Sequence, residues 1–247
     1  MTVHIWCPRA SDSALAIRNA LRDRGIAAHK TFSDIENNPR RLQRFLRRVR
    51  RGDLWINYGA PWLFGDYRGK YTPEGIKIFN GQPFLNKKSQ LLKLREKGVP
   101  TLEVSNTPRE GYIGRSANHQ GGHDLVTNTG RDYYTRKMEF SREVRIHIFK
   151  DKSIHAGLKI AQPNAHPWIR SYDSGWRISY AHARDIADSR RELAKQAIKA
   201  LDLDFGAVDI GVIKGDNALV LEVNTAPGIE GETLEAYVDK FSQEVGQ

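Results

Sequence analysis

The sequence predicts an α/β protein of 247 residues, with a βαβ region at its N-terminus and a β-hairpin near its C-terminus. Two observations lead to this fold class. In the first 80 residues, short β-branched and aromatic runs alternate with helical patterns, which is typical of βαβ units and a parallel sheet. Between about residues 207 and 224, two runs of alternating apolar residues flank Lys214-Gly215-Asp216-Asn217, a connection rich in turn formers, which predicts a hairpin.

The N-terminal region begins with a predicted strand at Val3–Cys7 and a helix at Asp12–Arg24 that Gly25 ends. Further strands are predicted at Asp53–Tyr58 and Ile76–Phe79. Between them lies a helix with apolar residues at positions i, i+3, i+4 and i+7, so one stripe of it should be buried. These residues are Leu42, Phe45, Leu46 and Val49.

The other faces of that helix carry seven arginines. They are Arg40, Arg41, Arg44, Arg47, Arg48, Arg50 and Arg51. Two interpretations stay open: a solvated face whose arginines also cover the sheet, or a contact surface for nucleic acid or another acidic partner.

The rest of the chain is predicted to hold a helix, a loop, two strands and a second helix before the hairpin. In order, these are a helix at Asn86–Lys97, a loop at Tyr112–Asp124, strands at Glu143–Phe149 and Ile154–Ile160, an irregular stretch at 161–180 and an amphipathic helix at 185–200. The strand at Glu143–Phe149 alternates apolar and polar residues, so it should be half-buried, with Glu143, Arg145 and His147 on one face.

Composition and charge place the chain among globular proteins. Hydrophobic residues make up 39% and charged residues 28%, which excludes disorder as the main state. The single cysteine cannot form an intramolecular disulfide, and no apolar run reaches 18 residues, so we expect a cytoplasmic protein without a membrane partner. The net charge of +10 is uneven: residues 200–247 hold ten acidic and two basic residues, a net of −8, against +18 elsewhere.

The hairpin brings two acidic residues together. If Ile213 pairs with Ala218, Asp209 lies directly opposite Glu222, and Asn224 follows on the same face. Like charges placed opposite each other destabilise a sheet, so a bound cation would explain the arrangement. Two carboxylates and an amide oxygen are ligands that Mg²⁺ accepts. The alternative is a different register, with two acidic residues on a wet face.

The stretch Leu221-Glu222-Val223-Asn224-Thr225-Ala226-Pro227-Gly228, preceded by Asp209, resembles the ATP-grasp superfamily of carboxylate-amine ligases. The nearest patterns are those of glutathione synthetase, D-alanine ligase, the ligases that add glutamate to ribosomal protein, and short phage-type ATP-grasp proteins. The resemblance covers about residues 80–235. It implies an ATP-grasp fold with an N-terminal βαβ (pre-ATP-grasp) lobe at 1–82, a small lobe with a glycine-rich loop at 83–140 and a C-terminal lobe with the hairpin at 141–247.

Site residues are carried over from the matching motifs. The resemblance implies nucleotide binding by Lys87, Arg115, Gly121, Gly122, Tyr134, Arg136, Lys137, Met138 and Glu143. It implies catalytic roles for Arg145, Lys159 and Arg170, and metal binding by Asp209, Glu222 and Asn224. One departure from the family pattern is Arg115, which stands where a lysine is usual.

The implied activity is ATP-dependent amide bond formation through an acyl-phosphate, with release of ADP and phosphate. The implied cofactors are ATP and two Mg²⁺ ions, with Mn²⁺ as a substitute. The expected partners are a small carboxylate and an amine, or a peptide or protein acceptor, and a homodimer fits the resemblance. The alternative function is a nucleic-acid or acidic-partner binding protein that keeps the fold as a scaffold and uses the helix from Arg40 to Arg51.

Overall fold

The computed structural model describes residues 1–32, 39–60, 75–82, 85–116, 131–167, 169–215 and 217–246. The chain forms two compact units. The first contains Met1–Phe84, Asp202–Gly206 and Asn224–Gln247, and the second contains Leu85–Leu201 and Ala207–Val223. Among the described residues, no helix combines the length and the apolarity needed to cross a membrane.

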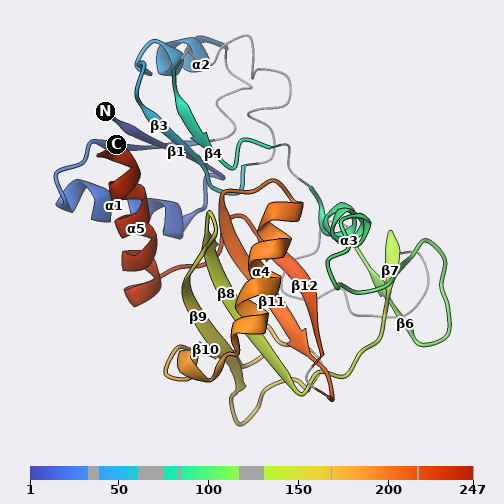
Figure 1. The fold of residues 1–247 in the computed structure, drawn as a ribbon. Coiled ribbons are helices and arrows are strands. Elements are labelled where there is room, and N and C mark those ends of the chain that lie inside the picture. The colour runs from blue at the N-terminus through green and yellow to red at the C-terminus, as the bar shows by residue number, and fades with distance from the viewer. Residues whose placement is uncertain are drawn as a thin grey trace. The chain divides into compact units, whose positions relative to one another are not determined.

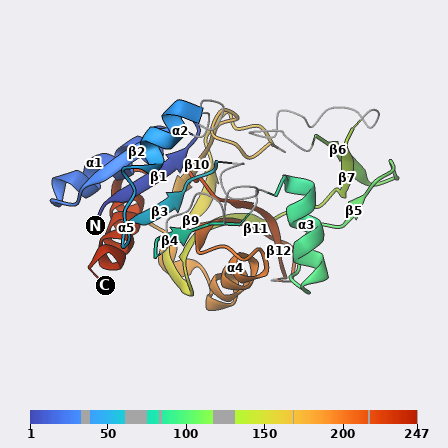
Figure 2. The same cartoon turned by 90° about the horizontal axis from the view of Figure 1, so that it is seen from above.

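The first unit is built on a parallel sheet in the order β2-β1-β3-β4 (Figures 1 and 2). The strands are β1 (Val3–Cys7), β2 (Ala28–Phe32), β3 (Leu54–Asn57) and β4 (Lys77–Phe79). The helices are α1 (Asp12–Asp23), α2 (Pro39–Leu46) and α5 (Gly231–Val245), and α1 packs beside α5. The βαβ prediction is confirmed. Gly25, at a φ of 77°, follows α1 in the left-handed conformation that glycine adopts without strain.

The predicted apolar stripe is buried in part, and it continues past the end of α2. Phe45 and Val49 form a core cluster with Trp6, Trp55 and Ala60, and Leu42 and Leu46 pack against that cluster from the same helical face. The helix itself ends at Leu46, so the last arginines of the segment follow it in turns.

Polar contacts join the N-terminal part of the first unit to its segments Asp202–Gly206 and Asn224–Gln247. The side chain of Asn80, whose φ is 52°, donates to the carbonyl of Phe205 at 3.0 Å and accepts from the backbone N–H groups of Asp204 and Phe205 at 2.8 and 3.1 Å. The buried Tyr58 hydroxyl donates to the carbonyl of Pro227. Helix α5 is thus a folded part of the first unit, although it holds many of the acidic residues.

The second unit contains a five-stranded sheet and a three-stranded sheet (Figures 1 and 2). The larger sheet has the order β10-β9-β8-β11-β12, formed by β8 (Arg142–Phe149), β9 (Lys152–Ala161), β10 (Trp176–Ser179), β11 (Phe205–Val212) and β12 (Ala218–Asn224). Helix α4 (Asp188–Ala200) packs against β8 and β9, and a short 3-10 helix, η2 (Ala183–Asp185), precedes it.

The smaller sheet has the order β5-β7-β6, formed by β5 (Val104–Ser105), β6 (Tyr112–Arg115) and β7 (Tyr133–Arg136). Helix α3 (Lys87–Glu96) precedes it in the chain. The side chain of Asn86 accepts a hydrogen bond from the backbone N–H of Ser89 at 2.9 Å, so it caps the start of α3.

Three local predictions were wrong. Residues Tyr112–Arg115, predicted as loop, form β6, and Trp176–Ser179, in the stretch predicted as irregular, form β10. Both strands exist because they pair with β7 and β9, a tertiary contact that the local pattern does not show. At the tip of the β11–β12 hairpin, the N–H of Ile213 donates to the carbonyl of Asn217 at 2.9 Å, one residue away from the predicted partner.

Candidate functional site

The alternation along β8 divides charged from apolar side chains. Val144, Ile146 and Ile148 are buried, while Glu143 and Arg145 alternate with them. On β9, Leu158 pairs with Val144, so Lys159 follows on the polar side beside Glu143. One face of the sheet therefore carries charge, as the sequence predicted for Glu143 and Arg145.

Five charged side chains form one ion-pair network on that face. We call Glu143, Arg145, Lys159, Arg170 and Asp209 the ion-pair network. Arg145 donates from Nε to Oδ1 of Asp209 at 2.6 Å and from Nη2 to Oδ2 at 2.8 Å. Lys159 Nζ donates to Oδ2 of Asp209 at 3.1 Å and to Oε2 of Glu143 at 3.0 Å. Arg170 Nε lies 3.5 Å from the other carboxylate oxygen of Glu143. Paired guanidinium and carboxylate groups in this geometry form strong, directional hydrogen bonds.

Burial and charge act against each other within the network. Asp209 is 2% exposed, and burial alone would raise its pKa, but the adjacent Arg145 and Lys159 cations hold the pKa well below its usual range. Burial would lower the pKa of Arg145, but the carboxylates of Asp209 and Glu222 raise it. The pKa of Lys159 is raised in the same way by Asp209 and Glu143, against its burial. All three groups are therefore charged at neutral pH.

Glu222 on β12 connects the network to α3. Lys87, the first residue of α3, places Nζ 2.5 Å from Oε2 of Glu222, and both side chains are about one quarter exposed. Since Glu222 also raises the pKa of Arg145, its charge and that of Asp209 act on the same guanidinium. Asn224 is the last residue of β12 and lies two positions beyond Glu222, on the same face of that strand.

The donor set fits a hard divalent cation in part. Within the described ranges, no three His, Cys, Asp or Glu side chains gather into a group that could hold a metal. The predicted ligands are the two carboxylates of Asp209 and Glu222 and the amide of Asn224. Mg²⁺ needs no more than one or two protein carboxylates when water and phosphate complete its shell. Asp209 accepts three hydrogen bonds from cations, and a carboxylate has about four acceptor positions. By this count, at most one acceptor position of Asp209 is left for a metal.

Two aromatic residues and a glycine for which the sequence predicted no role lie at the edge of the network. The guanidinium of Arg170 lies 4.7 Å from the ring centroid of Trp176, and its Nη2 donates to the carbonyl of Phe140 at 2.7 Å. A Cβ on Gly211 would come within 2.4 Å of the Phe140 ring. Isolated glycines within strands signal such close approaches, so this signal was present in the sequence.

The residues predicted to hold the nucleotide base lie on β7 and in the segment after it. Tyr134 is buried on β7 and Met138 is half-buried, whereas Arg136 and Lys137 are exposed. Arg115 on β6 donates from Nε to the hydroxyl of Thr135 at 3.4 Å. Gly121 and Gly122 lie outside the described residues.

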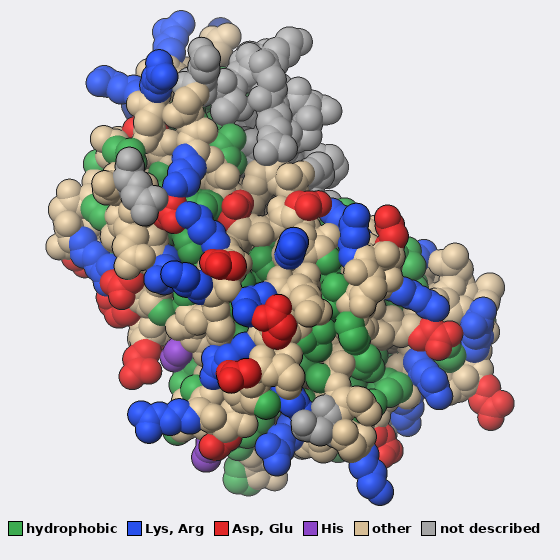
Figure 3. Space-filling model, in the orientation of Figure 1, with side chains coloured by type: hydrophobic (Ala, Val, Ile, Leu, Met, Phe, Trp, Pro, Cys, Tyr) green, Lys and Arg blue, Asp and Glu red, His purple; other side chains and the backbone are tan. Residues whose placement is uncertain are grey.

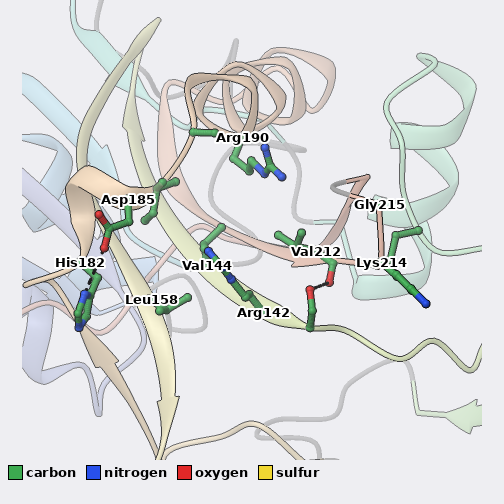
Figure 4. A pocket seen from close by; sticks show the side chains of 13 residues that line it. Arg142, Val144, Leu158, His182, Asp185, Arg190, Val212, Lys214 and Gly215 are labelled. Atoms are coloured by element: carbon green, nitrogen blue, oxygen red, sulfur yellow. Dashed lines mark hydrogen bonds and ion pairs between the residues drawn. The ribbon is translucent and has the colours of Figure 1, made fainter.

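A cavity of about 210 Å³ opens on the other face of the five-stranded sheet (Figure 4). Val144, Leu158 and Val212 line it, together with His182 and Asp185, whose side chains lie 3.2 Å apart. Residues of the ion-pair network do not line this cavity. The charged face and the cavity are therefore separate features of the second unit.

No protein-family model and no curated protein sequence matches the chain. Solved structures do. The chain is similar to the ATP-grasp ligase PsnB, complexed with a phosphomimetic variant of its minimal precursor, Mg and ADP, at 14% identity and a TM-score of 0.69, covering 99% of this chain and 98% of that one. It is similar to the macrocyclase MdnC from Microcystis aeruginosa MRC, bound with precursor peptide MdnA, at 14% identity and a TM-score of 0.63, covering 98% and 99%.

A third similar structure is the D-cycloserine synthetase DcsG, at 14% identity and a TM-score of 0.64, covering 99% of this chain and 100% of that one. All three likenesses span nearly the whole of both chains. Together with the two sheets and the β11–β12 hairpin, they confirm the predicted fold: this chain has the ATP-grasp fold.

Proposed function

We propose that the protein is an ATP-dependent carboxylate-amine ligase. The observation that carries the proposal is the ion-pair network, in which three buried or half-buried cations and two buried carboxylates gather on one sheet face, with Lys87 and Glu222 beside them. Phosphoryl transfer is catalysed chiefly by positioning reactants and neutralising charge, which needs such cations at fixed positions and no protein nucleophile.

In the proposed reaction, an oxygen of the substrate carboxylate attacks the γ-phosphorus of ATP, and the bond to the β–γ bridging oxygen breaks to release ADP. The resulting acyl-phosphate is attacked at its carbonyl carbon by an amine. The C–O bond to the phosphate then breaks, the amine loses a proton, and an amide and inorganic phosphate result. Arg145 and Lys159 are proposed to neutralise the charge on the transferred group, and Arg170 to orient the acyl-phosphate or the acceptor.

Asp209, Glu222 and Asn224 are proposed to hold Mg²⁺, two ions in all, with Mn²⁺ able to replace them. When bound, the metal would neutralise phosphate charge and hold the phosphates in place. The PsnB complex with Mg and ADP supports this choice of cofactor. Because Glu222 and Lys87 contact each other, both side chains must find other partners when metal and phosphate bind.

The nucleotide itself is proposed to contact Lys87, Arg115, Tyr134, Met138 and Glu143. Lys87 would contact a phosphate, and Arg115 would do so in place of the usual lysine. The remaining residues of the predicted set are Arg136, Lys137, Gly121 and Gly122, and their contacts stay a prediction. An enzyme of this kind would work in the cytoplasm, where ATP is plentiful, and assembly as a homodimer also stays a prediction.

A peptide or protein acceptor is the substrate that the comparisons favour. PsnB is described with a precursor and MdnC with a precursor peptide, while DcsG makes a small molecule. A protein that kept the fold only as a scaffold for binding would have no need to bury Asp209 against two cations, because a buried ion pair is costly to desolvate. The alternative binding function is therefore less well supported than the ligase.

The test is to incubate the protein with ATP and Mg²⁺ and panels of amino acids and peptides, and to measure ADP release and the intact mass of each acceptor. Lys159→Met should lower turnover by at least about a hundredfold, the cost of about 3 kcal/mol in transition-state stabilisation. Lys152→Met, an exposed change on the same strand, is the matched control and should leave turnover unaltered. The proposal would be overturned if wild type bound no nucleotide, or if Lys159→Met kept the full turnover of wild type.

A further inference from the structure

Seven arginines between residues 40 and 51 form the most concentrated positive charge of the chain. We call Arg40, Arg41, Arg44, Arg47, Arg48, Arg50 and Arg51 the arginine surface; all seven are exposed. No acidic residue and no lysine lies between residues 37 and 52. Figure 3 shows basic side chains gathered at the top of the molecule, where Figure 1 places α2.

A rigid core supports the arginine surface from below. Phe45 and Val49 are buried with Trp6 and Trp55, and the Phe45 and Trp55 rings stack with centroids 5.4 Å apart. The backbone that carries the arginines is thereby fixed. A ligand that binds there does not have to order the helix first, which lowers the entropic cost of binding.

Four acidic residues of the same unit have described partners of their own. Asp53, the acid that follows the segment, accepts from the backbone N–H groups of Thr2 and Arg50 at 2.7 and 2.9 Å and lies 3.1 Å from the His4 ring. On α5, Glu235 and Asp239 each lie 2.5 Å from a guanidinium nitrogen of Arg24, and Glu244 pairs with Lys77. The described contacts of these carboxylates are therefore made with groups other than the arginine side chains.

The pattern favours a short acidic peptide segment over nucleic acid. The first unit as a whole holds sixteen Lys and Arg against fourteen Asp and Glu, a net charge of only +2. A long polyanion would meet both signs, whereas a short segment feels the local charge within one Debye length, about 8 Å at physiological salt. The only aromatic residue of the segment, Phe45, is buried, so no ring is offered for base stacking.

The surface carries arginines and no lysine, which affects how it can bind carboxylates. Its planar guanidinium binds a carboxylate through two parallel hydrogen bonds, which a lysine ammonium cannot do. Helix α2 spans eight residues, about 12 Å, which matches an extended segment of about four residues. Several Asp or Glu side chains in such a segment could each meet an arginine.

We propose that the arginine surface docks an acidic segment, rich in Asp and Glu, of the polypeptide on which the ligase acts. The identity of the partner as the acceptor rests on the proposed function. The docking itself needs neither ATP nor metal, because it uses the first unit alone. It would raise the local concentration of the acceptor around the enzyme.

The experiment measures binding of a fluorescent twelve-residue peptide containing six Glu by anisotropy, at 150 mM salt and without nucleotide. The patch variant replaces Arg40, Arg44, Arg47 and Arg48 by Gln. The control variant replaces Arg95, Lys97, Arg184 and Lys199 by Gln, which removes the same charge from exposed positions of the second unit. Thermal unfolding of each variant checks that the fold is kept.

Wild type and the control variant should bind the peptide with similar Kd, and the patch variant should bind at least about tenfold more weakly, since each exposed pair contributes modestly. Equal binding by the patch and control variants would overturn the proposal. So would preferential binding of a 20-base-pair duplex, which would make the surface a nucleic-acid site. Nucleotide binding by wild type is measured separately and tests the proposed ligase. If wild type binds the peptide but no nucleotide, the docking proposal stands and the proposed ligase function is refuted.

Discussion

Replacing Asp209 by Asn should destabilise the second unit severely. The carboxylate is 2% exposed and accepts three hydrogen bonds from Arg145 and Lys159, whose side chains are 18% and 12% exposed. Asn keeps the shape but removes the negative charge, which leaves these two cations with Glu143 and the more distant Glu222. Breaking a buried ion pair on one side costs about 3–5 kcal/mol, a large part of a typical stability of about 5–15 kcal/mol.

The assay is urea unfolding at pH 7 combined with hydrogen exchange of peptides from β8 and β9, which reports on the second unit alone. Asp151→Asn, in the exposed turn between β8 and β9, is the control and should change stability by less than about 0.5 kcal/mol. The double variant Asp209→Asn, Lys159→Met should recover part of the loss, because it removes one stranded cation. Because the folded pKa of Asp209 is lowered, its contribution is present above about pH 4 and is lost as the pH falls. A loss below about 1 kcal/mol at pH 7 would refute the reasoning.

Three further predictions concern other residues. His147 is buried and its pKa is lowered to about 3, chiefly by burial, so the unfolded chain binds a proton more readily than the folded one. The neutral, buried His147 therefore costs no stability above about pH 6.5. As the pH drops toward 4, the free energy of unfolding should fall by about 1.4 kcal/mol per pH unit. The variant His147→Phe should lack this pH dependence when urea unfolding is measured across the same range. Gly157→Ala should cost about 1–3 kcal/mol in thermal unfolding, because its Cβ would lie 2.4 Å from Ile178; full stability would contradict that packing. Asn80→Ala should cost about 2–4 kcal/mol in urea unfolding, since it removes two buried hydrogen bonds and one part-buried hydrogen bond at a positive φ. A loss within about 0.5 kcal/mol would argue against them.

Several elements of the first unit could be predicted because their signals are local, whereas β2 and α5 were not predicted. Leu42, Phe45 and Leu46 specify the apolar face of α2, and the runs at Val3–Cys7 and Leu54–Asn57 specify buried strands. The missed strands are short and depend on pairing with other segments; they are β2, β5, β6, β7 and β10. Such short strands lack a periodic signal of their own.

The candidate site was predictable in its residues and not in its contacts. Period-two alternation places Glu143 and Arg145 on one face, and the motif resemblance adds Lys159 and Asp209. That Asp209 is held by two cations, and that Glu222 contacts Lys87, depends on which strands and helices become neighbours. The hairpin register shows the same limit, since the bond from Ile213 to Asn217 is set by the turn.

The structure divides the acidic residues of the C-terminal part of the sequence into two groups. Many of the acidic residues near the C-terminus lie on α5, where Glu235, Asp239 and Glu244 pair with basic residues of the first unit. Asp209 and Glu222, by contrast, face Arg145 and Lys87 in the second unit. The net charge of +10 does not reveal this separation, because a carboxylate on α5 and a carboxylate in the candidate site contribute equally to the sum.

The most direct test of the proposed ATP site is calorimetric titration of ADP with Mg²⁺ into wild type, Lys87→Met and Lys97→Met. Both lysines belong to the α3 region, but only Lys87 contacts Glu222, while Lys97 is exposed at the far end. We expect wild type and Lys97→Met to bind alike and Lys87→Met to bind about ten- to a hundredfold more weakly, the cost of one charged contact. Absence of nucleotide binding by wild type, or equal affinity in Lys87→Met, would contradict an ATP site beside the ion-pair network.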